Sequence, residues 1–257
     1  MNKIENVTAV IKTFLRDDYL YACVRSLRET YPDIKIIVGD GGRPSQTKRD
    51  YVESLGGEYY ELPFDCGIAV GRNTLVGKVK TDFVLIGDDD FYYEQESNLE
   101  AMLTLLEISD VAGGGVRQDG KLLGYQGFMR IEGDHLQYQR LLLDAWENHK
   151  GLRYKPCDLT FNFFIGKRDV LLAAGWDENI KVAYEHSDFF LTLKELGYKV
   201  VFTPHSIVTH KPDFINISEE VRNEYKRYRM RREDKERFFN KRHLKTMTDM
   251  WGYTDSL

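Results

Sequence analysis

Hydrophobic positions in the first half of the chain alternate between compact apolar runs and wider, helical spacing. The apolar runs predict buried strands at Val7–Lys12, Ile34–Asp40, Glu58–Leu62 and Phe83–Ile86. Between them, apolar residues at helical spacing predict helices at Asp17–Tyr31, in a short segment that ends near Val52, and at Ala69–Val79. This alternation predicts an α/β fold with a mostly parallel sheet and helices on both faces.

The second half of the chain is less regular. Helices are predicted at Asn98–Ile108, Asp169–Ala174 and Asp188–Leu196, strands and turns at Lys121–Tyr138, and a last strand at Lys199–Phe202. The stretch Val111–Arg117 contains three consecutive glycines and is typical of a strand or turn. It lacks the Lys-Ser/Thr pair that follows a phosphate-binding loop, so close packing of the backbone is the favoured explanation.

The fourth predicted strand runs directly into three aspartates, Asp88, Asp89 and Asp90. Adjacent carboxylates repel one another unless a cation or hydrogen-bond donors compensate them, and their hard oxygens favour Mg2+, Mn2+ or Ca2+ over zinc. The second predicted strand also ends in a carboxylate, Asp40. In parallel sheets the carboxyl ends of strands meet at one edge, where ligands bind. The sequence therefore predicts a metal or ligand site at this edge, with a solvated acidic turn as the alternative.

Composition limits the class of protein. With 257 residues, of which 42% are hydrophobic, the chain is long enough for one large domain or two small ones. An apolar stretch of about 18 residues and the apolar segment of a signal peptide are both missing, which predicts a cytosolic protein. The three cysteines are widely spaced and predict neither a disulfide framework nor a zinc site.

Positive charge is concentrated towards the C-terminal end. Residues 222–245 contain eleven Lys or Arg against four Asp or Glu, a net charge of +7, whereas the whole chain carries −5. Interleaved apolar residues are compatible with an amphipathic helix on an anionic membrane surface, or with a solvated helix packed on the domain. These residues are Tyr225, Tyr228, Met230, Phe238, Phe239 and Leu244. Nucleic-acid binding is not expected, because the rest of the chain is acidic and contains no nucleic-acid-binding motif.

Several motifs, taken in order, resemble the metal-dependent glycosyltransferases of the GT-A fold, of the family 2 type. They are Lys12–Arg16, Gly39–Gly42, Gly67–Asn73, Asp88–Phe91, and Glu185–Asp188 at the start of a helix that ends near Gly197. Lys12–Arg16, Ala69–Asn73, Asn162–Phe164 and Asn240–Leu244 are more closely similar to the catalytic domain of animal β-1,4-N-acetylgalactosaminyltransferases, the ganglioside-synthase type. The similarity runs from about Val7 to His243.

This resemblance implies a GT-A (Rossmann-like) fold and a division of the chain. We expect a glycosyltransferase domain at 1–215, with a nucleotide-binding half at 1–110 and an acceptor-binding half at 111–215. Residues 216–257 would form a basic helical C-terminal extension.

The resemblance also implies roles in donor binding. Asp88 and Asp90 correspond to the DxD motif, in which Asp90 ligates Mn2+ or Mg2+ and Asp88 faces the ribose or a metal-bound water. Asp89 lies between them with a less defined role. The other residues expected to bind the donor are Thr13, Arg16 and Arg72 near the base or diphosphate, Asp40 at the uracil ring, and Asn162 at a sugar hydroxyl. The alternatives are a turn residue for Asp40 and a surface ion pair for Arg72.

Inverting transfer requires a base for the acceptor hydroxyl. Asp188 is the first candidate and Glu185 the second, although acids at a helix start also serve as caps. Family 2 enzymes usually have Glu-Asp where this chain has Glu185 and His186, so His186 is a third candidate. His210 is a candidate metal ligand, with His205 as its competitor. Trp146, Phe163, Phe164, Trp176 and Tyr184 are candidates for an acceptor pocket, or for the core.

The resulting hypothesis is a cytosolic enzyme that transfers a hexosamine, N-acetylgalactosamine first, from its UDP form to a hydroxyl of a glycan or glycolipid with a β linkage. UDP-galactose, UDP-glucose and UDP-N-acetylglucosamine remain alternative donors, because no residue identified above determines the epimer. A sugar nucleotidyltransferase would need an Arg-containing, glycine-rich signature after the first strand, which is missing. A catalytically silent carbohydrate-binding module of the same fold is the alternative from another class.

Overall fold

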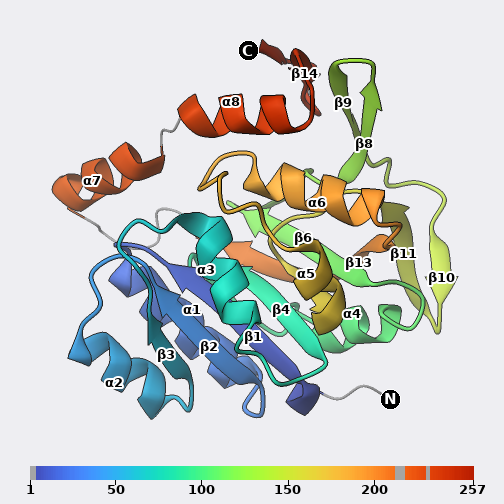
Figure 1. Cartoon of the computed structure of the whole chain (residues 1–257). Coiled ribbons are helices and arrows are strands. Elements are labelled where there is room, and N and C mark those ends of the chain that lie inside the picture. Colours follow the sequence, from blue (N-terminus) through green and yellow to red (C-terminus); the bar gives the residue numbers. More distant parts are fainter. Residues whose placement is uncertain (1–3, 212–217, 230–231) are drawn as a thin grey trace.

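The computed structural model describes residues 4–211, 218–229 and 232–257. A central sheet is covered by helices on both faces, and a smaller sheet stands at one end (Figure 1). The first half contains η1 (Ile4–Asn6), β1 (Val7–Thr13), α1 (Asp17–Thr30), β2 (Lys35–Asp40), α2 (Gln46–Ser54), β3 (Glu58–Glu61), α3 (Gly67–Val76), β4 (Phe83–Asp88), β5 (Phe91–Tyr92) and α4 (Leu99–Leu105).

The second half contributes shorter strands and the C-terminal helices. It contains β6 (Val111–Gln118), β7 (Lys121–Leu122), β8 (Gly127–Glu132), β9 (His135–Arg140), β10 (Glu147–His149), β11 (Leu152–Cys157), β12 (Phe164–Lys167), α5 (Arg168–Ala174), α6 (Glu185–Glu195), β13 (Val200–His210), α7 (Glu219–Arg229), α8 (Arg232–Lys241), β14 (Thr246–Thr248) and β15 (Thr254–Ser256). The main sheet has the order β10-β11-β13-β6-β12-β4-β1-β2-β3.

The first half of the sheet is parallel, as predicted. β1 pairs with β2 and β4, and β2 pairs with β3. Side chains of β1 alternate between the faces: Ala9 and Ile11 join the apolar cluster that includes α1 and α4, and Val10 joins the one that includes α3, α5 and α6. The register sets Thr13 beside Asp40 and Lys12 beside Asp88. The two acidic strand ends therefore meet at one edge, as the alternation predicts.

Antiparallel strands in the second half return the chain to this edge. β12 runs antiparallel to both β4 and β6, and an antiparallel strand starts where its neighbours end, so Asn162 lies beside Asp88. The predicted strand Lys199–Phe202 is in fact much longer, because β13 continues through a register shift after Phe202. It ends with His210 opposite Phe91, and β14 and β15 follow it, so it is not the last strand.

The glycine-rich stretch forms β6, and close packing explains it. A Cβ atom on Gly113 would stand 2.2 Å from Oγ1 of Thr160. One on Gly114 would stand 2.5 Å from the Phe163 ring and 2.6 Å from the carbonyl oxygen of Ser206. The favoured explanation from sequence is therefore confirmed.

The C-terminal segment forms two helices and a small hairpin. In Figure 1 α8 runs beside α6, and Phe238, Phe239 and Leu244 are 0%, 0% and 2% exposed in the same apolar cluster as α6. Three of the six apolar residues considered for a membrane surface are therefore core, and Met230 lies outside the described residues. Across the part of the chain that the structure describes, no helix is both long and apolar enough to span a membrane.

We expect Phe238→Ala to lower the free energy of unfolding by about 3–5 kcal/mol, because it leaves a cavity under a fully buried ring. Urea denaturation measures the change, with Phe128→Ala as a control, since Phe128 is 39% exposed on β8. A loss below about 1 kcal/mol would mean that α8 is a loosely attached extension.

Candidate active site

A cavity of about 440 Å3 opens at the carboxyl ends of β1 and β4. Both halves of the chain contribute to it, together with α7. The lining residues include Lys12, Phe14, Arg16, Gly67, Ile68, Arg72, Asp88, Asp89, Asp90, Asn162, Val182, Glu185, His210, Tyr225, Tyr228 and Arg229. Most of the residues predicted from sequence to form the site are therefore brought together.

Asp88 lies between two donors from different elements. Arg72 of α3 donates from Nη2 to Oδ1 of Asp88 at 2.9 Å, and Asn162 donates from Nδ2 to Oδ2 at 3.2 Å. The Arg72 guanidinium is only 3% exposed, so the surface ion pair considered for it does not apply. Nη1 of Arg72 and Oδ1 of Asn162 are buried without a hydrogen-bond partner among the described residues. Since such groups are normally paired, both are available to a ligand.

Asp89 and Asp90 share one cation. Arg16 pairs with Asp89 and, from Nη1, with Asp90 Oδ2 at 2.7 Å. Asp89 is 1% exposed and also accepts a hydrogen bond from Oγ1 of Thr13 at 2.7 Å. Nε2 of His210 lies 3.3 Å from Asp90 Oδ2. Asp89 is thus a buried anchor for β1, whereas Asp90 and His210 face the cavity together.

The negative charges of Asp89 and Asp90 are compensated to different extents, and their pKa values shift in opposite directions. Burial raises the pKa of Asp89, and the charge of Arg16 only partly opposes this. Burial acts in the same direction on Asp90, but Arg16 and His210 outweigh it and hold the pKa of Asp90 well below its usual range. Burial alone would lower the pKa of His210, yet the hydrogen bond to Asp90 and the Asp90 charge raise it.

Glu185 is the acid that the structure brings into the cavity from the opposite side. It is the first residue of α6 and is 4% exposed. Tyr184 before it has a left-handed φ of 68°, which turns the chain into the helix. Burial raises the pKa of Glu185 to about 7, while the Arg72 charge acts in the opposite direction. A carboxylate with this pKa can take up a proton near neutral pH.

His186 is held in place as a hydrogen-bond donor. Its Nε2 lies 2.6 Å from the carbonyl oxygen of Thr160, so Nε2–H donates to that oxygen. Burial lowers the pKa of His186 to about 3, and the Arg72 charge adds to the effect, so the ring stays neutral. Its Nδ1 is buried without a partner among the described residues.

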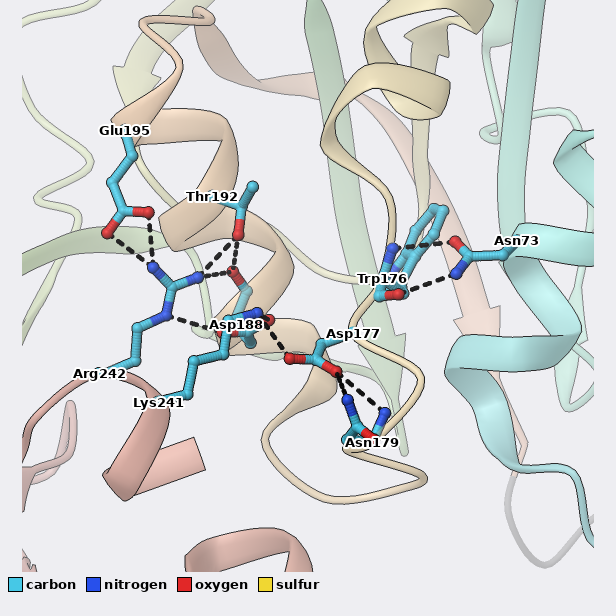
Figure 2. A network of polar contacts seen from close by, with 9 residues as sticks. All are labelled: Asn73, Trp176, Asp177, Asn179, Asp188, Thr192, Glu195, Lys241 and Arg242. Carbon is cyan, nitrogen blue, oxygen red and sulfur yellow. Dashed lines mark hydrogen bonds and ion pairs between the residues drawn. The ribbon is translucent and has the colours of Figure 1, made fainter. Parts of the chain in front are cut away.

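Asp188 lies outside the cavity, one helical turn further along α6. Its side chain is 1% exposed and is held by Nζ of Lys241 at 2.8 Å and Nε of Arg242 at 2.7 Å (Figure 2). It lines neither this cavity nor the one that adjoins it. This position does not fit the role of first-choice base that the helix start suggested.

Asp40 is also closed off from the cavity. It is 0% exposed, and its Oδ2 accepts hydrogen bonds from Lys48 Nζ and Tyr59 OH, both at 2.8 Å. The backbone N–H of Gly42 donates to its Oδ1 at 2.7 Å. Both oxygens are therefore used within the protein, which fits the turn residue considered for Asp40 better than a contact with uracil.

A second cavity of about 350 Å3 adjoins the first and shares Asp88, Asn162, Val182, Glu185 and His210 with it. Its aromatic lining residues are Phe91, Tyr125, Phe161 and Tyr184, and His186 also lines it. Of the aromatic residues proposed from sequence for an acceptor pocket, only Tyr184 reaches it. Phe163, Phe164 and Trp176 are core residues at 0%, 0% and 3% exposure, and Trp146 packs on Phe202.

Sequence reasoning missed Lys12 and the α7 residues. Lys12 lines the cavity with its Nζ 4.9 Å from the centre of the Phe14 ring, and burial lowers its pKa. Tyr225 of α7 lies under the Arg16 guanidinium at 4.7 Å. Lys12 stood inside a recognised motif and could have been named. No local signal indicates that α7 folds back over the end of β1.

Among the described residues, no group of three or more His, Cys, Asp or Glu is arranged to hold a metal. Asp90 and His210 nevertheless offer two suitable ligands with their closest atoms 3.3 Å apart in the cavity. Divalent cations held by one or two protein ligands complete their shells with phosphate and water oxygens. The donor set therefore fits a cation that a diphosphate helps to bind. His205, the competing candidate, lines neither cavity.

The mixed α/β fold, with its mostly parallel central sheet and flanking helices, is the GT-A fold of its structural neighbours. The solved structure of S. aureus TarS residues 1–349 matches 79% of this chain and 57% of that chain, with a TM-score of 0.53 and 18% identity. The same region of TarS in complex with UDP matches 86% of this chain and 63% of that chain, with a TM-score of 0.54 and 16% identity. These likenesses establish the fold.

Sequence comparison gives the family. The model of glycosyl transferase family 2 matches residues 8–171, more than half of the chain. The protein belongs to this family. It is 34% identical to mouse β-1,4 N-acetylgalactosaminyltransferase 2 over 218 residues, which are 81% of this chain and 40% of that protein. It is 33% identical to human β-1,4 N-acetylgalactosaminyltransferase 1 over 199 residues, 72% of this chain and 35% of that protein. The chain thus spans less than half the length of these relatives.

The raised pKa of Glu185 predicts a pH-dependent stability. The folded protein holds this proton up to about pH 7, whereas an exposed glutamate loses it near 4.5, so the stabilisation present below pH 4.5 is lost as the pH rises through 7. We expect the stability of Glu185→Gln relative to the parent to increase between pH 5 and pH 8, by at most about 3 kcal/mol. Urea denaturation at both pH values measures this, with the exposed Glu132→Gln as the control. The same difference at both pH values would contradict the pKa shift.

Proposed function

We propose that the protein is a metal-dependent, inverting glycosyltransferase that moves N-acetylgalactosamine from its UDP form to a hydroxyl of a glycan acceptor, forming a β linkage. One observation carries this proposal: a single cavity holds a compensated cluster of aspartates on one side and Glu185, with its pKa near 7, on the other. Membership of family 2 and the names of the relatives support the reaction and the sugar.

The first cavity offers suitable residues for each part of the UDP-sugar donor. Phe14, Tyr225 and Tyr228 offer an aromatic wall for the uracil ring. Lys12 and the unpaired Nη1 of Arg72 offer positive charge for the diphosphate. Asp88 faces the ribose, and the free Oδ1 of Asn162 accepts a hydrogen bond from a sugar hydroxyl.

Asp90 and His210 would hold Mn2+ or Mg2+. The cation supplies positive charge that stabilises the departing diphosphate. Arg16 pairs with Asp90 in the structure and stays close enough to share that charge.

Glu185 is the base of this proposal, in place of Asp188. In its ionised form, which predominates above about pH 7, it takes the proton of the acceptor hydroxyl as the hydroxyl oxygen bonds to the anomeric carbon from the face opposite the diphosphate. The bond between that carbon and the diphosphate oxygen breaks, and its electron pair leaves with the diphosphate. The acceptor sugar lies in the second cavity, against Tyr125, Phe161 and Tyr184, with Nδ1 of His186 accepting from a hydroxyl.

UDP-galactose, UDP-glucose and UDP-N-acetylglucosamine are the rival donors, and a glycan or glycolipid is the acceptor class. A silent carbohydrate-binding module would bind sugar without transferring it. Contact with an anionic membrane is not part of the proposal, because Phe238, Phe239 and Leu244 are buried in the core and Tyr225 and Tyr228 line the first cavity.

We expect UDP to bind by calorimetry only with Mn2+ present, and the affinity to fall at least tenfold in Asp90→Ala, which lacks one of the two cation ligands. Asp134→Ala, on a surface carboxylate that pairs with Lys245, is the matched control. A donor screen with the four UDP-sugars follows in the same assay. UDP binding that is absent, or indifferent to both Mn2+ and Asp90, would contradict the metal-dependent donor site.

We expect Glu185→Gln to lower kcat by about 10²–10⁴-fold with UDP affinity unchanged, since only the proton acceptor is lost. In the parent, kcat/KM should fall as the pH drops below about 7, where Glu185 becomes protonated. Initial rates across pH 5.5–9 measure both effects, with Glu132→Gln as the control. A parent-like rate in Glu185→Gln would exclude it as the base.

A further inference from the structure

A buried ion cluster lies behind the proposed base. Asp188 is 1% exposed, and its carboxylate meets two cations from the end of α8 and just beyond it, Nζ of Lys241 at 2.8 Å and Nε of Arg242 at 2.7 Å (Figure 2). A buried carboxylate without such partners would cost several kcal/mol, so this contact is obligatory for the fold around α6.

Arg242 spans one face of α6. Besides the Asp188 carboxylate, its guanidinium contacts the Asp188 carbonyl oxygen at 2.8 Å and Oγ1 of Thr192 at 2.7 Å. Nη1 reaches both carboxylate oxygens of Glu195 at 2.6 Å. Positions 188, 192 and 195 recur on one side of a helix. One side chain therefore fixes the axis of α6 over two turns.

Lys241 ties α6 to the loop that precedes it. Its Nζ also contacts Oδ2 of Asp177 at 2.8 Å, and the other Asp177 oxygen accepts two hydrogen bonds from Asn179 (Figure 2). Beside them, Asn73 of α3 exchanges hydrogen bonds with the backbone of Trp176 at 2.8 and 2.9 Å. The loop 175–184 is thus fixed between α3 and α8.

α8 holds the last residues of this loop as well. Oδ2 of the fully buried Asp234 accepts the backbone N–H of Val182 at 3.0 Å and of Ala183 at 3.4 Å. The Tyr184 ring stacks on Phe238 with centres 5.2 Å apart. Glu185 is the next residue. The three residues that precede it in the chain are therefore all in contact with α8.

From these contacts we infer that the cluster of Asp188, Lys241 and Arg242 positions Glu185 for proton transfer, an inference that rests on the proposed function. Glu185 is one turn from Asp188 on α6, so a tilt of the helix moves its carboxylate within the cavity. A displacement of about 1 Å can cost about 100-fold in rate. The three residues are positioning residues that touch no substrate. All three lie beyond residue 171, where the match to the family model ends.

Lys241→Gln removes the ion pair and, since Lys241 is 38% exposed, leaves no buried cavity. We expect kcat to fall about 10- to 100-fold while UDP affinity stays within about twofold. Lys241→Arg should restore most of the rate. The control is Lys245→Gln, four residues along the chain, which breaks a surface ion pair with Asp134 and should leave kcat unchanged. Should Lys241→Gln fail to fold, Asp177→Asn weakens the other ion pair of Lys241, at a carboxylate that is 18% exposed, compared with 1% for Asp188.

The double variant Lys241→Gln with Glu185→Gln separates positioning from a general structural effect. If Lys241 acts through Glu185, the double variant is as slow as Glu185→Gln alone. A parent-like kcat in Lys241→Gln, or a loss of the same factor with Glu185 already replaced, would overturn the inference. A different result, a parent-like rate in the single variant Glu185→Gln, would exclude Glu185 as the base. That result would overturn this inference as well.

Discussion

The structure depends on the compensation of carboxylates that the fold buries at one edge of its sheet. Parallel strands deliver Asp40 and Asp88 to the same edge, and β4 adds Asp89 and Asp90 directly after them. Burial makes uncompensated charge costly, so each acid has acquired a cation or donor from another element. The donors include Lys48 from α2, Arg72 from α3 and Arg16 from the loop after β1. These contacts join the helices around one centre.

Where compensation is complete, the acids support the structure; where it is incomplete, they can take part in chemistry. Asp40 and Asp188 have their oxygens occupied and lie outside the cavities. Arg72 and Asn162 retain free polar atoms in the cavity wall, and Glu185 is buried with a pKa near neutrality. The same physical constraint therefore distinguishes two carboxylates on a single helix, the ion-paired Asp188 and the proposed base Glu185.

Sequence periodicity was sufficient for the first half of the fold, because strands β1, β2 and β4 and their helices depend on local apolar spacing. It also placed Asp88, Asp89 and Asp90 at the sheet edge where the cavity lies. It failed for β13, whose bulge after Phe202 lets a strand continue past Pro204. The helix start also gave no sign that Asp188 is ion-paired, because the cations that bind it are more than 50 residues away and leave no local pattern. The burial of Phe238 and Phe239 in the C-terminal segment was likewise not predictable from local sequence, because it depends on how that segment packs in the folded chain.

The contact between Asp188 and Lys241 spans 53 residues of sequence, and it has a consequence for inheritance. A substitution at Asp188 removes the buried anion that Lys241 and Arg242 share, and one at Lys241 or Arg242 leaves that anion undercompensated. Either change is tolerated best when the other positions change with it. We therefore expect these positions to change together among descendants of this chain. Exchange of the C-terminal segment between diverged relatives would separate Lys241 and Arg242 from the residue at position 188 with which they evolved.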